Sequence, residues 1–484
     1  MIAASRQLPR LNAGLYVQPI ARPAARVDTV ALLMGALGFF AFMPYPALNV
    51  GNFTAVQIGN FLTLLLAAPL LLIPWRNQPF YLYLVLLIPL CVSFMKVAIL
   101  GTGELDLCFK VTAVWGLTCL TLPVIQAYGA RYALHVQTGI AIATIIHTIV
   151  GLWQMHGFSA GYFPLTFLYV NNSFLSVQDN VEIIYRWIQR PFGLFPEPSA
   201  MSSSLAPWVL LWLAVLCNLV QLKQKPARWQ RVLFGIAAAG GLALIIISRS
   251  GHAAVTLAAA VCFLGIWFLR SKATPQSFLA LLFVFGVLLP LVLWQASVAL
   301  SDRLGGASAV GNSSWEDRST SLLLGAKFLV SSDPWTTLFG FGAGHSSPIL
   351  LRETGLEAVW SVVLTYLYET GMVGVVFTTW VALAVIRAWL QAGRTFVFTA
   401  FIGVWFVGVM ITTSYFQLLP IWVALGWMTI WPQVCQPVVE GRFVPSRDHL
   451  PLETPLPRRH VSRFRREDAM AADTAVSLPW RDSK

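Results

Sequence analysis

Long apolar stretches separated by short polar segments dominate the pattern of this 484-residue chain. Many of these stretches approach the roughly 20 residues that a helix needs to cross ~30 Å of hydrocarbon. We place about twelve such spans, at residues 29–46, 56–75, 80–100, 107–127, 132–155, 199–221, 231–248, 252–269, 277–297, 358–386, 396–413 and 416–432. The pattern predicts an all-α polytopic integral membrane protein, in which the last pair, 396–432, fits either a hairpin of two spans or a re-entrant pair.

Composition agrees with this class, because 57% of the residues are hydrophobic and only 11% are charged. A soluble globular chain is about a quarter charged, so an ordinary cytosolic enzyme and a disordered protein are both excluded. The net charge of +12 comes from Lys and Arg in short loops and tails beside the apolar spans. Such a distribution indicates membrane topology and not a nucleic-acid partner. The six cysteines contain no C-x-x-C motif, so we expect neither a zinc site nor a disulfide framework.

The positions of the basic residues also predict an orientation. When the N-terminus is placed in the cytoplasm, most of the 32 Lys and Arg fall on the cytoplasmic side, as the positive-inside rule requires. We therefore expect both termini in the cytoplasm: a basic tail at 1–28, a transmembrane domain at 29–432, and a disordered basic tail at 433–484. The long loops 156–198 and 298–357 are then external, and they concentrate charge in a charge-poor chain, which makes them candidates for function.

The first external loop ends in R-P-F-G-L-F-P-E-P-S at residues 190–199. Prolines on both sides of Glu197 favour an extended backbone before the next span. One interpretation is a carboxylate held rigidly at the mouth of the bundle, and the other is a helix N-cap with a solvated glutamate. The segment S-R-S-G at 248–251 then joins two spans with almost no loop. Arg249 is either a ligand for a phosphate or carboxylate, or a snorkelling anchor of the turn.

The second external loop carries three cations, at Arg303, Arg318 and Lys327. Ser314-x-x-Asp317 resembles a capping box, so we expect a helix across the top of the bundle, with these cations forming its outer surface.

Further along the chain, the run Gly340-Phe341-Gly342-Ala343-Gly344-His345 fits either a plain turn or a cradle for phosphate. His345 is a candidate base, acid or hydrogen-bond donor. Glu369 lies inside a span, where a carboxylate is a functional candidate by default. The histidines inside or beside spans, His135, His147 and His156, are too scattered for a metal cluster.

The order of these segments resembles the Wzy-type polysaccharide polymerase and O-antigen ligase superfamily of bacterial envelopes. The similar stretches are 190–199, 248–251, E-D-R at 316–318, D-P through F-G-F-G-A-G-H at 333–345, and Y-E-T-G-M-V-G at 368–374. They fall within residues 30–432, and the two tails lie outside the resemblance. The resemblance implies a GT-C-like membrane glycosyltransferase with a helical periplasmic cap, acting without a metal ion or cofactor at the outer face of the bacterial inner membrane.

The function that the resemblance implies is polymerisation of undecaprenyl-diphosphate-linked oligosaccharide repeats into a surface polysaccharide or exopolysaccharide. An O-antigen ligase, which transfers glycan to lipid A–core, and a lipid-linked oligosaccharide flippase remain as alternatives. The resemblance implies functional arginines at Arg249 and Arg318, with Arg303 a weaker match, and it implies Glu369 in either a functional or a packing role. Our catalytic candidates are Glu197, Arg249, Arg318 and His345, and our substrate-binding candidates are Arg190, Arg303, Lys327 and Glu369. Cations would stabilise the leaving diphosphate, and Glu197 would accept the proton of the attacking hydroxyl. The partners are the lipid-linked donor and acceptor, membrane lipid, a flippase and a chain-length regulator, with no nucleic acid.

Overall fold

The computed structural model describes residues 28–45, 47–50, 53–72, 80–165, 190–216, 220–250, 333–354, 361–391 and 418–436, with single positions at 286, 290, 320, 323 and 327. Within these residues six helical segments are long and apolar enough to cross a membrane. They are α3 (Tyr81–Leu100), α4 with α5 (Leu105–Cys119 and Thr121–Tyr128), α6 (Ala133–Ala160), α9 (Pro198–Leu216), α10 (Arg228–Ile247) and the first part of α17 (Val362–Gln391). The chain is a mostly helical, membrane-embedded protein. The expected spans 252–269 and 396–413 lie outside the described residues, as does 277–297 apart from positions 286 and 290. Of the expected tails only Asp28 and residues 433–436 are described, and 433–436 belong to α19 (Leu419–Val434) and β4 (Cys435–Gln436).

The N-terminal elements are shorter than the sequence pattern predicts. Helix α1 (Thr29–Ala41) has 13 residues, and α2 (Ile58–Ala67) continues into a short 3₁₀ helix, η1 (Ala68–Leu72). Between them, β1 (Ala47–Val50) and β2 (Phe53–Gln57) pair as antiparallel strands, with Ala47 opposite Gln57. Pro44 and Pro46 follow α1, and proline cannot continue a helix. The apolar run therefore ends in a hairpin and not in a longer span.

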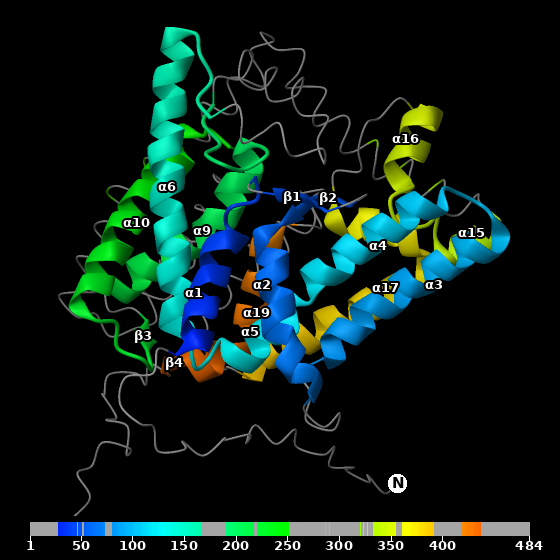
Figure 1. Cartoon of the computed structure of the whole chain (residues 1–484), viewed down its shortest axis with the longest axis horizontal. Helices are drawn as coiled ribbons and strands as arrows, with labels where there is room; N and C mark the ends of the chain where they lie inside the picture. Colours follow the sequence, from blue (N-terminus) through cyan, green and yellow to red (C-terminus); the bar gives the residue numbers. More distant parts are fainter. Residues whose placement is uncertain are drawn as a thin grey trace, which may run out of the picture. The chain divides into compact units, whose positions relative to one another are not determined.

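Helices α1, α6, α9 and α10 form one packed group. Helix α6 lies against both α1 and α10, and α10 lies against α9 (Figure 1). The contact between α1 and α6 is backbone to backbone, since a Cβ added at Gly139 would lie 2.0 Å from the Gly35 carbonyl oxygen. Small residues allow helices to approach this closely in membranes.

Hydrogen bonds fix one end of this group. The Tyr132 hydroxyl donates to Asp28 at 2.9 Å, which joins the start of α6 to the start of α1. Gln224, just before α10, donates to the Arg131 carbonyl at 2.7 Å. Two-residue strands β3 (Gln221–Leu222) and β4 (Cys435–Gln436) pair antiparallel and bring the end of α19 (Leu419–Val434) to the same place.

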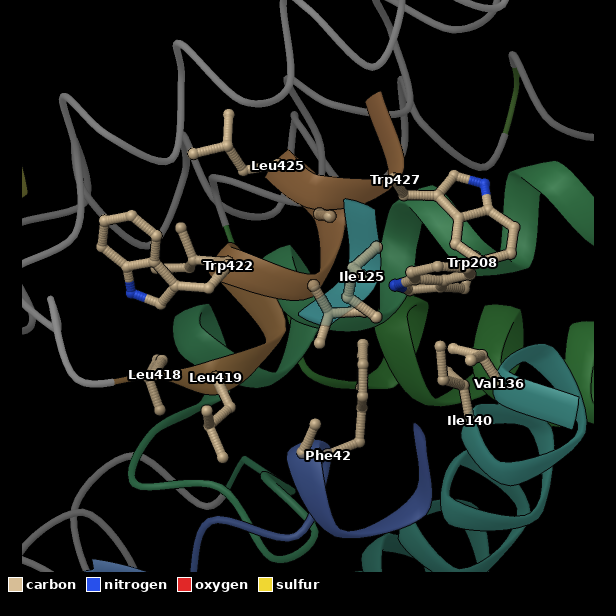
Figure 2. Close-up of a cluster of buried hydrophobic side chains, with 14 of the residues drawn as sticks. Phe42, Ile125, Val136, Ile140, Trp208, Leu418, Leu419, Trp422, Leu425 and Trp427 are labelled. Atoms are coloured by element: carbon tan, nitrogen blue, oxygen red, sulfur yellow. The ribbon is translucent and has the colours of Figure 1, made fainter. Parts of the chain in front are cut away.

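Helices α17 and α19 are at the centre of a second packed group. Helix α17 lies against α3 and α19, and α19 also lies against α5. Figure 2 shows the core where α19 meets α9 and α1: Trp208 and Trp427 make an edge contact with ring centroids 5.2 Å apart, and Phe42 contacts Trp208 at 6.0 Å. A buried helix of 16 residues, α19, thus lies at the expected span 416–432, and it is shorter than the six membrane-crossing segments.

Candidate functional site

The segment 190–197 is a buried part of the core and not an open loop. Phe192, Leu194 and Phe195 are almost fully buried, and the Phe195 N–H bonds to the Phe192 carbonyl at 3.1 Å in a tight turn. Gly193 has φ +58°, and a Cβ there would lie 2.7 Å from Nδ1 of His147, so only glycine fits.

Glu197 occupies the N-cap position of α9. Its carbonyl accepts the Met201 N–H at 3.1 Å, and Pro198 follows as the first helical residue, a favoured place for proline. Its side chain is partly buried, and the Ser199 hydroxyl donates to its Oε1. The structure therefore combines the two interpretations of this segment: Glu197 is an N-cap residue, and its carboxylate is held in place by the first turn of α9.

The two motifs R-P-F-G-L-F-P-E-P-S and S-R-S-G meet in the fold. Arg190 donates from Nη1 to the Arg249 carbonyl at 3.3 Å. The hydroxyls of Ser202 and Ser248 bond to each other at 2.8 Å, joining the start of α9 to the end of α10. We call Arg190, Ser202, Ser248 and Arg249, together with the neighbouring Ser250, the arginine–serine cluster.

The backbone of this cluster is unusual at Arg249, which has φ +48° and an exposed side chain. A left-handed backbone at a residue other than glycine carries strain, and strained residues cluster at functional sites. Beside it, Ser250 is 4% exposed, and its hydroxyl has no hydrogen-bond partner within the described part of the chain. The cluster thus combines an exposed side chain at Arg249 with a buried hydroxyl at the next residue.

The motifs 340–345 and 368–371 also meet, and we call this pair of segments the glycine clamp. Helix α17 is broken at Gly371, where φ is +66° and ψ is −158°. The N–H of Phe341 bonds to the Tyr368 carbonyl at 2.7 Å, and the N–H of Gly342 bonds to the Glu369 carbonyl at 3.2 Å. Two N–H groups of the glycine-rich run therefore satisfy carbonyls just before the break in a helix, which is a structural use for them in place of a phosphate cradle.

His345 is buried within the glycine clamp with both ring nitrogens engaged. The Glu104 N–H donates to Nε2 at 2.8 Å, so Nε2 is the acceptor. Nδ1 lies 3.2 Å from the Ala343 carbonyl and is then the protonated nitrogen of the neutral ring. These contacts join the turn between α3 and α4 to the clamp. In this arrangement neither ring nitrogen faces a substrate.

Glu369 is 2% exposed, and its Oε1 accepts the Ser346 hydroxyl at 2.6 Å. The carboxylate also interacts with the backbone N–H groups of Gly344 and Ser346, at the start of α16 (Ser346–Thr354). A carboxylate suits a helix N-terminus, where N–H groups lack partners. Glu369 thus caps α16 from another helix.

Lys96 of α3 completes the clamp from the opposite side. Its Nζ donates to the Gly340 carbonyl and to the Thr336 hydroxyl, both at 2.9 Å, at the end of α15 (Pro334–Phe339). Asp333 caps the start of α15, accepting from the N–H groups of Trp335 and Thr336 at 3.0 and 3.1 Å. Hydrogen bonds from Thr336 hold the pKa of the exposed Asp333 carboxyl below its usual value.

The residues implied by the resemblance divide between these two places. Arg190, Glu197 and Arg249 belong to the region of the arginine–serine cluster, and His345 and Glu369 belong to the glycine clamp. Arg303 and Arg318 lie outside the described residues, and Lys327 is described only as a single exposed helical position. Within the described ranges, no group of three or more His, Cys, Asp or Glu residues is placed to hold a metal ion.

Two polar residues that matter to this geometry carried no signal in the sequence analysis. The sequence pattern predicts no role for Gln154, and for His147 it addresses only metal binding, yet both bond directly to the segment before Glu197.

Comparison of the sequence with protein-family models and with curated proteins finds no match in either case.

Proposed function

We propose that this chain is a membrane glycosyltransferase that polymerises undecaprenyl-diphosphate-linked oligosaccharide repeats at the periplasmic face of a bacterial inner membrane. In this proposal the full chain has about twelve spans and a helical periplasmic cap, and both termini are cytoplasmic. The observation that carries it is the meeting of two separate motifs, 190–199 and 248–251, which brings Arg190 and Arg249 together beside the start of the helix that Glu197 caps.

The chemistry needs cations where negative charge develops. Cleavage of the glycosyl bond leaves a diphosphate, and positioned donors that meet its charge lower the barrier. Arg249 offers an exposed planar guanidinium, and its carbonyl is held by Arg190. Arg303, Arg318 and Lys327 would add cations from the second external loop.

The attacking sugar hydroxyl needs a proton acceptor, and Glu197 is our choice. Its carboxylate is partly exposed and oriented by the Ser199 hydroxyl, so it can be reached by substrate. His345 has both ring nitrogens bonded and Glu369 has Oε1 bonded within the glycine clamp, and we assign them to holding the α3–α4 turn and α16 in place.

The test is the size of envelope glycans in a strain that lacks the gene, complemented with wild type, Arg249→Ala or Glu197→Gln at equal membrane abundance. Arg231→Ala is the matched control, because Arg231 is an exposed arginine at the opposite end of α10. We expect only single repeats in the deletion strain and in both site variants, and long chains with Arg231→Ala.

Two results would contradict the proposal and identify another function. Long chains that accumulate on the lipid carrier in the deletion strain would show a ligase. Single repeats that stay on the cytoplasmic face would show a flippase.

A further inference from the structure

The backbone of residues 192–194 is buried without regular secondary structure, so its hydrogen bonds must come from elsewhere. A buried backbone group without a partner costs about 1–3 kcal/mol, which makes such segments rare unless side chains replace the missing bonds. Here one face of α6 supplies them. Gln154 and His147 are seven residues apart, which places them two helical turns apart on the same side.

Gln154 binds three backbone groups of the segment. Its Oε1 accepts the N–H groups of Phe192 and Gly193, both at 3.0 Å, and its Nε2 donates to the Gly193 carbonyl at 2.9 Å. Gln154 is itself fully buried. The amide side chain of Gln154 therefore supplies the backbone hydrogen bonds that a neighbouring strand would supply in a sheet.

His147 links the same segment to α1. The Leu194 N–H donates to Nδ1 at 3.0 Å, so Nδ1 is an acceptor, and Nε2 is then the protonated nitrogen that donates to the Phe42 carbonyl at 2.5 Å. Both partners are backbone groups with fixed roles, so a single neutral tautomer fits. The ring also packs against Phe195, with centroids 4.7 Å apart.

We infer that His147 and Gln154 are positioning residues for the proposed glycosyl transfer: they hold residues 192–194 and thereby place Arg190 on one side and Glu197 on the other. This inference rests on the proposed function. We call residues 192–194 the clasped segment. Arg190 lies two residues before it and Glu197 lies three residues after it, and Pro196 restricts the backbone before Glu197. Neither His147 nor Gln154 touches the reacting groups, so both act through the segment that they bind.

The experiment uses the full-length protein in lipid nanodiscs, with turnover of lipid-linked oligosaccharide and hydrogen–deuterium exchange measured on the same samples. Gln154→Ala is compared with Gln137→Ala. Both glutamines are fully buried on α6, but the Gln137 amide has no hydrogen-bond partner among the described residues. We expect Gln154→Ala to lower kcat by about 100-fold, the cost of a misplacement of about 1 Å, while KM for the donor changes much less. The amides of 192–194 should lose protection, and those of α10 should keep it.

A second pair of variants separates the two bonds of His147. Asn at this position can present an acceptor near Nδ1 for the Leu194 N–H, whereas Gln can present a donor near Nε2 for the Phe42 carbonyl. We expect His147→Asn to retain most of the turnover and the protection of 192–194, and His147→Gln to lose both.

The outcomes distinguish the two proposals. If the wild type forms no polymer, the proposed function fails, and the exchange data still show whether the two residues hold the segment. If Gln154→Ala leaves protection and kcat as in Gln137→Ala, or if His147→Gln is as active as His147→Asn, the positioning role is overturned.

Discussion

Replacing Gly371 with alanine should destabilise the fold through both backbone strain and a backbone clash within the glycine clamp. Its φ of +66° and ψ of −158° lie in a region that is essentially restricted to glycine. A side chain forced into such a backbone conformation costs about 1–3 kcal/mol. The added Cβ would also lie 2.4 Å from the Gly340 nitrogen and 2.6 Å from the Leu338 carbonyl oxygen, and both of these are backbone atoms.

Relief of that clash requires the two segments of the clamp to separate. Separation breaks the hydrogen bonds from Phe341 to Tyr368 and from Gly342 to Glu369, each worth about 1 kcal/mol. We therefore expect Gly371→Ala to lower the free energy of unfolding by about 3–5 kcal/mol, combining backbone strain with the lost bonds.

Gly101→Ala is the matched control. Gly101 also has a positive φ, +61°, but a Cβ there would meet nothing within 4 Å. It should cost only the strain of the left-handed backbone, about 1–2 kcal/mol. Unfolding of both variants is measured by titration with SDS in mixed micelles, followed by circular dichroism. A loss at Gly371 no larger than the loss at Gly101 would refute the reasoning about backbone contact.

Three further predictions follow from individual residues. Arg249→Gly should be about 1 kcal/mol more stable than Arg249→Ala in the same titration, because glycine relieves the strain at φ +48°, although both variants lack glycosyl transfer; equal stabilities would argue against strain. Lys96→Met removes two buried hydrogen bonds at the end of α15 and should lower the free energy of unfolding by about 1–3 kcal/mol. Lys110→Met is the control: Lys110 forms a partly exposed ion pair with Asp106 on the same helix, and its loss should change the free energy of unfolding by less than about 0.5 kcal/mol. Hydrogen bonds from Thr336 lower the pKa of the Asp333 carboxyl in the folded protein, so its contribution to stability is complete above the unfolded-state pKa and is lost as pH falls through the folded-state pKa. The Tm of the wild type should therefore fall at acidic pH by an amount that Asp333→Asn does not show, and identical curves of Tm against pH would contradict this.

Hydropathy alone was sufficient to locate the long helices. The expected spans 80–100, 107–127, 132–155, 199–221 and 231–248 coincide with α3, α4–α5, α6, α9 and α10 to within a few residues at most of their ends. These helices are apolar over about the length that a membrane requires, so local composition specifies them. The hairpin at 47–57 and the break at Gly371 were not predicted, because their backbone bonds depend on neighbours far away in sequence.

In the candidate site, too, the sequence reveals local features but not the contacts between distant segments. The motifs were recognisable one by one, but their pairing was not: 190–199 meets 248–251, while 340–345 meets 368–371. Contacts between distant segments leave no local pattern for sequence reasoning to find. His147 and Gln154 were missed because a buried polar residue on an apolar helix gives no sign of its partner. The catalytic roles of Arg249 and Glu197 stay predictions until they are tested.

The position of the clasped segment along α6 determines how deep in the membrane it lies. His147 and Gln154 are 14 and 21 residues beyond Ala133, which corresponds to about 21 and 32 Å along the axis. Arg131, exposed just before α6, is suited to the headgroup region at the other surface. With about 30 Å of hydrocarbon counted from Ala133, Leu194 at the level of His147 falls in the far third of the bilayer, and Phe192 and Gly193 at the level of Gln154 fall at its edge; tilt of α6 places all three deeper.

Water is scarce inside the hydrocarbon layer, so the backbone of residues 192–194 depends on the hydrogen bonds from His147 and Gln154. In the orientation proposed above this level belongs to the outer leaflet, so an isoprenoid-anchored donor would reach Arg249 and Glu197 by lateral diffusion, with its tail still in the lipid.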